Sequence, residues 1–181
     1  AIAIGNSAGQ TQQGSQAIAI GTNAGASGQR TNAIAIGTNA GQSNQGYLSV
    51  AIGSGAGQTQ QSIQSVAVGA EAGGIEQGQS SVALGYQAGQ TSQGNSSVAI
   101  GARAGATGQA AAALAVGYDS GNKGQGPFAI AVGYSAGYFQ QKSAAVAIGW
   151  NAGYTAQQSQ AIAIGANAGQ SQQGGSAVEI G

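Results

Sequence analysis

The sequence predicts an all-β protein, a parallel β-solenoid in which one short unit stacks on the next. Three observations predict it: an uninterrupted repeat of 16 residues, alternation of bulky and tiny side chains at the start of each repeat, and two glycine columns. Eleven full repeats occupy residues 1–176, and a partial repeat occupies residues 177–181. Because no linker or change of composition interrupts the repeats, we expect one domain over residues 1–181.

Each repeat begins with a pattern typical of a short β-strand. Counting sixteen positions from Ala1, positions two and four are always aliphatic, as in Ile2 and Ile4, whereas position three is Ala in every full repeat. This period of two favours a strand with two different faces. Gly at position five ends the strand and permits a tight turn. A helix is disfavoured, because two Gly per repeat would each cost about 1 kcal/mol there.

Positions ten to fourteen, QTQQG in the first repeat, predict a second and more polar strand. Two strands and two turns make one coil of a solenoid, whose strands pair with their equivalents in neighbouring coils about 4.8 Å away. About eleven coils then form a rod about 50 Å long. A single coil has no core of its own, and stacking makes the core continuous.

Gln is invariant at position thirteen, although the neighbouring positions vary. An amide both donates and accepts, so stacked Gln side chains can hydrogen-bond to one another along the rod. We therefore predict a structural amide ladder, with a row of ligand-binding side chains as the alternative. The column comprises Gln13, Gln29, Gln45, Gln61, Gln77, Gln93, Gln109, Gln125, Gln141, Gln157 and Gln173.

The invariant Ala at position three predicts self-association. If positions two and four face inward, position three faces outward, and a flat Ala face can approach another copy closely. In the alternative orientation Ala faces inward, and the exposed aliphatic stripe then requires a partner. Either orientation predicts a homo-oligomer, a trimer or a filament; unprotected strands at the two ends add a route to end-to-end assembly. The column comprises Ala3, Ala19, Ala35, Ala51, Ala67, Ala83, Ala99, Ala115, Ala131, Ala147 and Ala163.

Aromatic side chains are concentrated in the second half of the chain. Tyr118, Tyr134 and Trp150 occupy position six of consecutive repeats, and Tyr138 and Tyr154 occupy position ten. Stacked rings stabilise one another by about 0.5–1.5 kcal/mol per pair. The alternative is that these five residues contact a partner or a glycan.

The composition predicts no enzyme. The chain lacks His and Cys, which excludes the commonest general base, a thiol nucleophile and the main soft metal ligands. Glu71 and Glu76 share one repeat, but their positions tolerate any residue, and we expect a solvated surface. Arg103 and Asp119 hold the same position in adjacent coils and should pair. We therefore expect no catalytic residue, no metal and no cofactor.

The balance of charge also limits the partners. Four basic and four acidic residues give a net charge of zero, so no electrostatic footprint indicates nucleic acid. The apolar runs are too short to span a bilayer, so we expect no membrane insertion by this segment.

The AIAIG, VAIG and VAVG strands, each followed by xxAG, resemble the head repeats of YadA-like trimeric autotransporter adhesins, with related repeats in phage and giant-virus fibre proteins. The resemblance covers the whole chain, although the fixed Gln lies outside that motif. It implies a left-handed parallel β-roll, three chains in one surface-exposed fibre, and attachment to host matrix.

These observations lead to one functional prediction and one alternative. We predict a non-enzymatic structural or adhesive fibre subunit, extracellular or on the cell surface, or in a virion fibre. The alternative is a ligand-binding module, either glycan-binding or ice-binding. Thr and Ser at position eleven motivate ice binding, but Ile75, Lys123 and Phe139 interrupt that row.

Overall fold

The computed structural model describes residues 1–181 and contains fifteen strands of three residues and no helix. Twelve strands come from positions two to four and form one parallel sheet, with each strand paired to the equivalent strand of the next coil. These strands are β1 (Ile2–Ile4), β2 (Ile18–Ile20), β3 (Ile34–Ile36), β4 (Val50–Ile52), β6 (Val66–Val68), β8 (Val82–Leu84), β10 (Val98–Ile100), β11 (Leu114–Val116), β12 (Ile130–Val132), β13 (Val146–Ile148), β14 (Ile162–Ile164) and β15 (Val178–Ile180).

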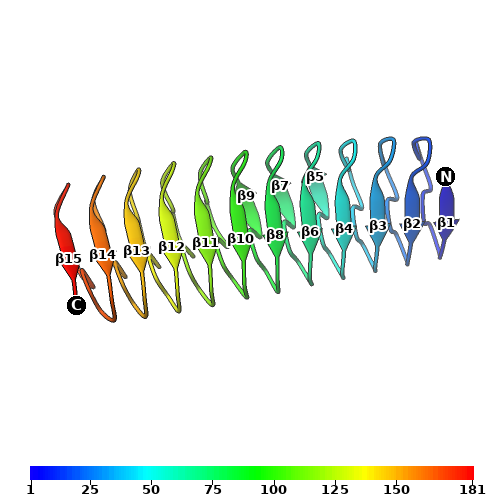
Figure 1. Cartoon of the computed structure of the whole chain (residues 1–181). Helices are drawn as coiled ribbons and strands as arrows, with labels where there is room; N and C mark the ends of the chain where they lie inside the picture. Colours follow the sequence, from blue (N-terminus) through cyan, green and yellow to red (C-terminus); the bar gives the residue numbers. More distant parts are fainter.

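The coils stack along one axis, with the two ends of the chain at opposite ends of the rod (Figure 1). The register is constant: Ile2 pairs with Ile18, Ala3 with Ala19, and so on to Ile164 and Ile180. Every position of the repeat therefore becomes a column along the rod. The predicted parallel β-solenoid with 16-residue coils is confirmed.

Hydrogen bonds between coils run around the whole perimeter and not only along the sheet. Of 120 backbone hydrogen bonds, 96 involve at least one residue outside the strands. The Gly25 amide N–H, for example, donates to the Ala40 carbonyl at 2.9 Å, and the Ser27 N–H donates to the Gln42 carbonyl at 2.9 Å. The turns are thus held in register by the same ladder that holds the strands, which satisfies their backbone polar groups.

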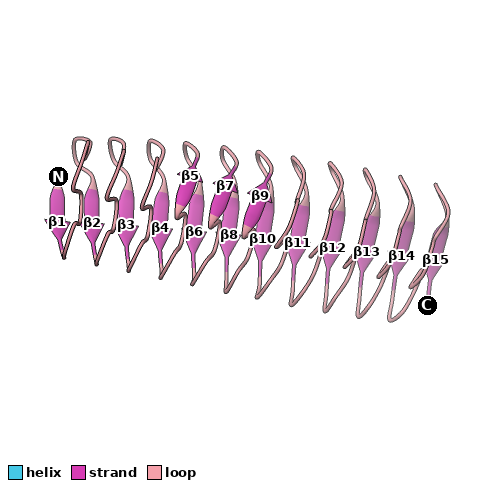
Figure 2. Ribbon diagram, turned by 180° about the vertical axis from the view of Figure 1, so that it is seen from behind, coloured by secondary structure: helices cyan, strands magenta, loops and turns pink.

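The second strand is regular in only three coils. There it forms β5 (Thr59–Gln61), β7 (Ile75–Gln77) and β9 (Thr91–Gln93), a separate sheet in a second layer (Figure 2). In other coils only position eleven makes a parallel bridge, as between Ser27 and Ser43. Position twelve has a left-handed backbone both outside and inside these three strands, with φ of 57° at Gln12 and 55° at Gln60 in β5.

Glycine at position five is required by both backbone conformation and space. Its φ lies between 120° and 131° along the column, a region that L side chains rarely adopt. A Cβ atom on Gly53 would lie only 2.6 Å from the Gly69 carbonyl oxygen of the next coil. The close approach of successive turns therefore fixes Gly at this corner.

Candidate functional site: an aliphatic face and a polar hollow

The coil interior holds Ala and Gln, which corrects one expectation from the sequence. The Ala residues of position three from Ala19 to Ala163 are completely buried within a single chain. They pack against the buried Ala residues of position eight, such as Ala24 and Ala56. The expected outward orientation is therefore wrong for Ala19, Ala35, Ala51, Ala67, Ala83, Ala99, Ala115, Ala131, Ala147 and Ala163, whereas Ala3, in the first coil, is exposed. The alternative orientation is the one that the structure adopts.

The narrow interior explains this orientation. In every coil the position-thirteen amide nitrogen donates to the position-two carbonyl across the coil, as from Gln45 Nε2 to the Ile34 oxygen at 2.6 Å. A Cβ atom on Gly41, at position nine, would lie 2.6 Å from Gln45 Oε1. The side-chain amide thus fills the space between the two layers, and only small residues fit beside it.

The aliphatic residues consequently face outward from the twelve-stranded sheet. We call the side chains of positions two and four in these strands the aliphatic face. Ile52 is 36% exposed, Ile100 37% and Ile148 38%, although each lies in the middle of a strand ladder. The face carries no charged side chain and extends over twelve strands, about 50 Å at the usual strand spacing.

The Gln column makes amide–amide hydrogen bonds over part of its length. Gln93 donates to Gln109, and the links continue through Gln125, Gln141 and Gln157 to Gln173, with nitrogen–oxygen distances of 3.0–3.3 Å. Gln13 donates to Gln29 at 3.2 Å. The Oε1 atoms of Gln45, Gln61, Gln77 and Gln93 are buried without a hydrogen-bond partner. The bond across the coil occurs in all eleven coils, so it is the more regular of the two interactions.

The orphaned amide oxygens lie against glycine. The positions at which Gly57 and Gly73 would carry a Cβ lie 2.7 Å from the Oε1 atoms of Gln61 and Gln77. In glycine only a hydrogen occupies this direction, whereas a Cβ atom would collide with the amide oxygen. Position nine therefore stays Gly because of both this lack of space and its left-handed φ of about 50°.

The predicted aromatic contact residues form face-to-face stacks. The rings of Tyr118 and Tyr134 lie 5.2 Å apart at 14°, and those of Tyr138 and Tyr154 lie 5.0 Å apart at 6°. Arg103 lies over the Tyr118 ring at 4.8 Å, and Lys123 lies over the Tyr138 ring at 5.7 Å. One face of each ring in these pairs is thus covered by its stacking neighbour. Trp150, which is 54% exposed, is in neither stack, and Tyr134 is similarly exposed at 53%.

The charged residues form local surface networks. Arg103 Nη2 donates to Asp119 Oδ2 at 2.6 Å and also to the Tyr118 hydroxyl, and the bond to Asp119 raises the pKa of Arg103 above its ordinary value. Glu71 accepts from Gln87 and Gln90, whereas Glu76 accepts from Ser92. These two carboxylates thus bind different partners. No group of three or more acidic side chains is placed to hold a metal ion.

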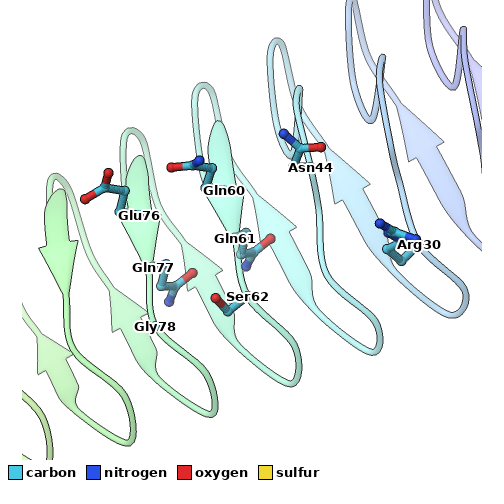
Figure 3. A pocket seen from close by; sticks show the side chains of 8 residues that line it. All are labelled: Arg30, Asn44, Gln60, Gln61, Ser62, Glu76, Gln77 and Gly78. Carbon is cyan, nitrogen blue, oxygen red and sulfur yellow. The ribbon is translucent and has the colours of Figure 1, made fainter.

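Sequence reasoning missed a polar hollow on the opposite side of the coil from the aliphatic face. Arg30 lines three adjoining depressions of about 530, 450 and 330 Å³. Asn44, Gln60 and Glu76 follow one another on successive coils along it (Figure 3). We call the depressions that share Arg30 the Arg30 hollow. The signal in the sequence is the contrast between long polar residues at position twelve and small residues at position fourteen.

The fold and its two faces define a β-solenoid repeat protein with an outward apolar face. Within that class, residues 13–40 match two copies of the YadA head domain repeat. This match confirms the resemblance that the strand and glycine motifs indicate. No curated protein and no solved structure matches the chain. None of the structural elements is a helix able to cross a membrane.

Proposed function

We propose that this chain is a structural and adhesive fibre segment, extracellular or on a cell surface, whose copies associate through the aliphatic face. The observation that carries the proposal is an uninterrupted aliphatic stripe, half-exposed or exposed, on all twelve strands of the main sheet. Soluble monomers rarely expose a continuous apolar surface of this length, and such surfaces mark interaction sites. The match to YadA head repeats supports a surface adhesin and an assembly of three copies.

A second copy of the same chain is the best partner for this face. The face repeats with the coil spacing, so a parallel copy presents the same stripe over the same length. Full burial of an exposed Ile, Leu or Val side chain contributes about 1.5–3 kcal/mol, and each half-buried side chain of this face contributes a fraction of that. The face offers no charge with which a polar partner could pair. An apolar contact between equivalent sheets is therefore favoured.

The test is the mass of the chain in solution, measured by sedimentation and native mass spectrometry. We expect a species of about three times the 17.2 kDa of one chain. The double variant Ile100→Glu and Ile148→Glu places charges on the aliphatic face and should lower this mass. Gln140→Glu, on an exposed position-twelve residue, is the matched control and should retain it. A soluble 17.2 kDa monomer of the parent chain would overturn the proposal.

Filament formation is a distinct outcome of the same experiment. Electron microscopy separates a discrete trimer from rods joined end to end. Filaments that persist in the double variant would show that the ends, and not the aliphatic face, make the contact. That result would contradict the proposed interface while leaving a fibre function in place.

A ligand-binding role is the second candidate. The structure places the position-eleven residues in parallel register, from Thr11 with Ser27 to Thr155 with Ser171, on an exposed or half-exposed row. A regular row of hydroxyl groups is the feature that motivates ice binding, and Ile75, Lys123 and Phe139 interrupt it. Thermal hysteresis of the purified chain supports ice binding, and its absence rejects ice binding.

A further inference from the structure

The Arg30 hollow follows directly from which side chains occupy three neighbouring columns. Position twelve supplies one wall through Asn44, Gln60 and Glu76. Position fifteen supplies the other wall, through Tyr47, Ile63, Gln79 and Asn95. Between the walls, position fourteen is Gly46, Ser62 and Gly78, so the floor carries almost no side chain. The depression therefore runs along the rod axis.

The same columns explain why the hollow is confined to the first half of the rod. In the second half, Gly108 and Gly124 hold position twelve, so the wall is missing there. Lys142 and Gln158 hold position fourteen and stand where the floor would be. Between Arg30 and Glu76 the hollow extends over about three coil steps, roughly 14 Å at the usual strand spacing. It accommodates a short extended ligand.

Arg30 is the only charged residue in the first 70 and has no partner within the chain. Its guanidinium lies 5.6 Å from the centre of the Tyr47 ring and makes no ion pair. The cation–π contact holds the guanidinium at the hollow, and its N–H donors stay free for a ligand. A carboxylate matches this planar set of donors, as does a phosphate.

The rest of the hollow suits hydroxyl groups better than a peptide. Asn44, Gln60, Gln79 and Asn95 each carry an amide, which both donates and accepts, as a sugar hydroxyl does. A peptide that adds as a strand needs free backbone groups at a sheet edge, but here the neighbouring coils already pair with one another, as from the Gly46 N–H to the Gln61 carbonyl at 2.7 Å. The polar lining favours a carbohydrate.

We propose that the Arg30 hollow binds a carboxylate-bearing oligosaccharide. Arg30 pairs with the carboxylate, Tyr47 positions the guanidinium, and the amides of positions twelve and fifteen bind the hydroxyl groups. Glu76, at the far end, accepts a hydrogen bond from a further hydroxyl. The hollow faces away from the aliphatic face, so it stays open when copies associate there. The inference rests on the proposed attachment role and assigns to it a site and a class of ligand.

The test is isothermal titration calorimetry of the intact assembly with 3′-sialyllactose, a trigalacturonate and neutral lactose. We expect both acidic sugars to bind and lactose to bind at least about tenfold more weakly, since lactose has no carboxylate to accept the charge-assisted hydrogen bonds of Arg30. If only one acidic sugar binds, the ligand carries the type of acidic sugar residue present in that probe, sialic acid or galacturonic acid. Arg30→Gln should weaken binding at least about tenfold, with the mass of the assembly unchanged.

Lys142→Gln is the matched control. Lys142 holds position fourteen, as Arg30 does, but in a coil without the hollow. It should bind the acidic sugars as the parent chain does. Equal losses in Arg30→Gln and Lys142→Gln would show non-specific charge attraction and overturn the site. No binding of either acidic sugar, or tighter binding of a hexaglutamate peptide, would also overturn it. The mass measurement tests association through the aliphatic face, and calorimetry tests sugar binding at the Arg30 hollow. Failure of one proposal can therefore be distinguished from failure of the other.

Discussion

At the scale of single residues, position thirteen shows how one side chain fixes its neighbours. The Gln amide joins the two layers of each coil and leaves room only for small residues beside it, Ala, Gly and in one coil Ser120. Position twelve, directly before it, is also Gln in several coils, but there the side chain faces solvent. Adjacent residues with the same side chain thus have very different energetic roles.

Gln140 and Gln141 test this difference within one coil. Gln141 donates to the Ile130 and Ala145 carbonyls and to Gln157, whereas Gln140 is exposed. Gln141→Glu replaces these donors by a buried carboxylate that faces carbonyl oxygens, and should destabilise the chain by about 3 kcal/mol or more. Gln140→Glu should stay within about 0.5 kcal/mol of the parent. Urea denaturation followed by circular dichroism measures both, and similar midpoints would contradict the buried role.

Gly117 and Gly108 both have a positive φ, but only Gly117 lacks space for a Cβ atom. Gly117 has a φ of 126°, and a Cβ atom there would lie 2.5 Å from the Gly133 carbonyl oxygen. Gly108 has a φ of 65°, and no atom lies closer than 4.0 Å to its Cβ position. We expect Gly117→Ala to disrupt stacking locally, and Gly108→Ala to cost only about 1 kcal/mol.

Ala156 already occupies the position of Gly108 in another coil, with a φ of 54°, which supports the milder expectation. Hydrogen exchange of the flanking amides locates the damage. Equal protection in the two variants would show that the turn at position five has more room than its geometry indicates.

At the scale of the strand, the sequence was sufficient to predict the repeat, the strands and the parallel stack. It did not decide which face of the strand lies inside. A period of two identifies two faces, but the inner one depends on the width of the coil, which the Gln amide and the glycine of position nine set together. The Arg30 hollow was equally hidden, since it depends on three columns that only stacking brings side by side.

Strand β12 tests the assigned orientation directly. Ala131 is completely buried, whereas Val132 beside it is half-exposed. Ala131→Val overfills the interior and should cost about 1–3 kcal/mol. Val132→Ile adds a methylene group on the outer side, where Ile is frequent in other coils, and should be nearly neutral. Thermal unfolding of the two variants compares them, and a larger loss in Val132→Ile would reverse the assignment.

At the scale of the whole molecule, the rod is a linear array of coils in which contacts are made only between neighbours. Each coil pairs only with the coils before and after it, and all backbone ladders run in the same register. The stability of such a rod is approximately a sum of coil terms and nearest-neighbour terms. The stability of the rod should therefore depend less on the number of coils than on the alignment of equivalent repeat positions between neighbouring coils.

Deletions of different length test this dependence on phase. Removing residues 49–64 excises one complete coil that carries no charge and joins Leu48 to Ser65 in the native phase. Gln45 then stacks beside Gln77, Gly41 beside Gly73 and Ala35 beside Ala67, so every column continues. We expect a folded, slightly shorter rod with a urea midpoint close to that of the parent. Removing residues 49–56 instead shifts the later columns by half a coil, places aliphatic side chains opposite polar turns, and should abolish the cooperative transition. Circular dichroism and hydrogen exchange measure both variants, and equal stability would contradict a fold specified by its columns.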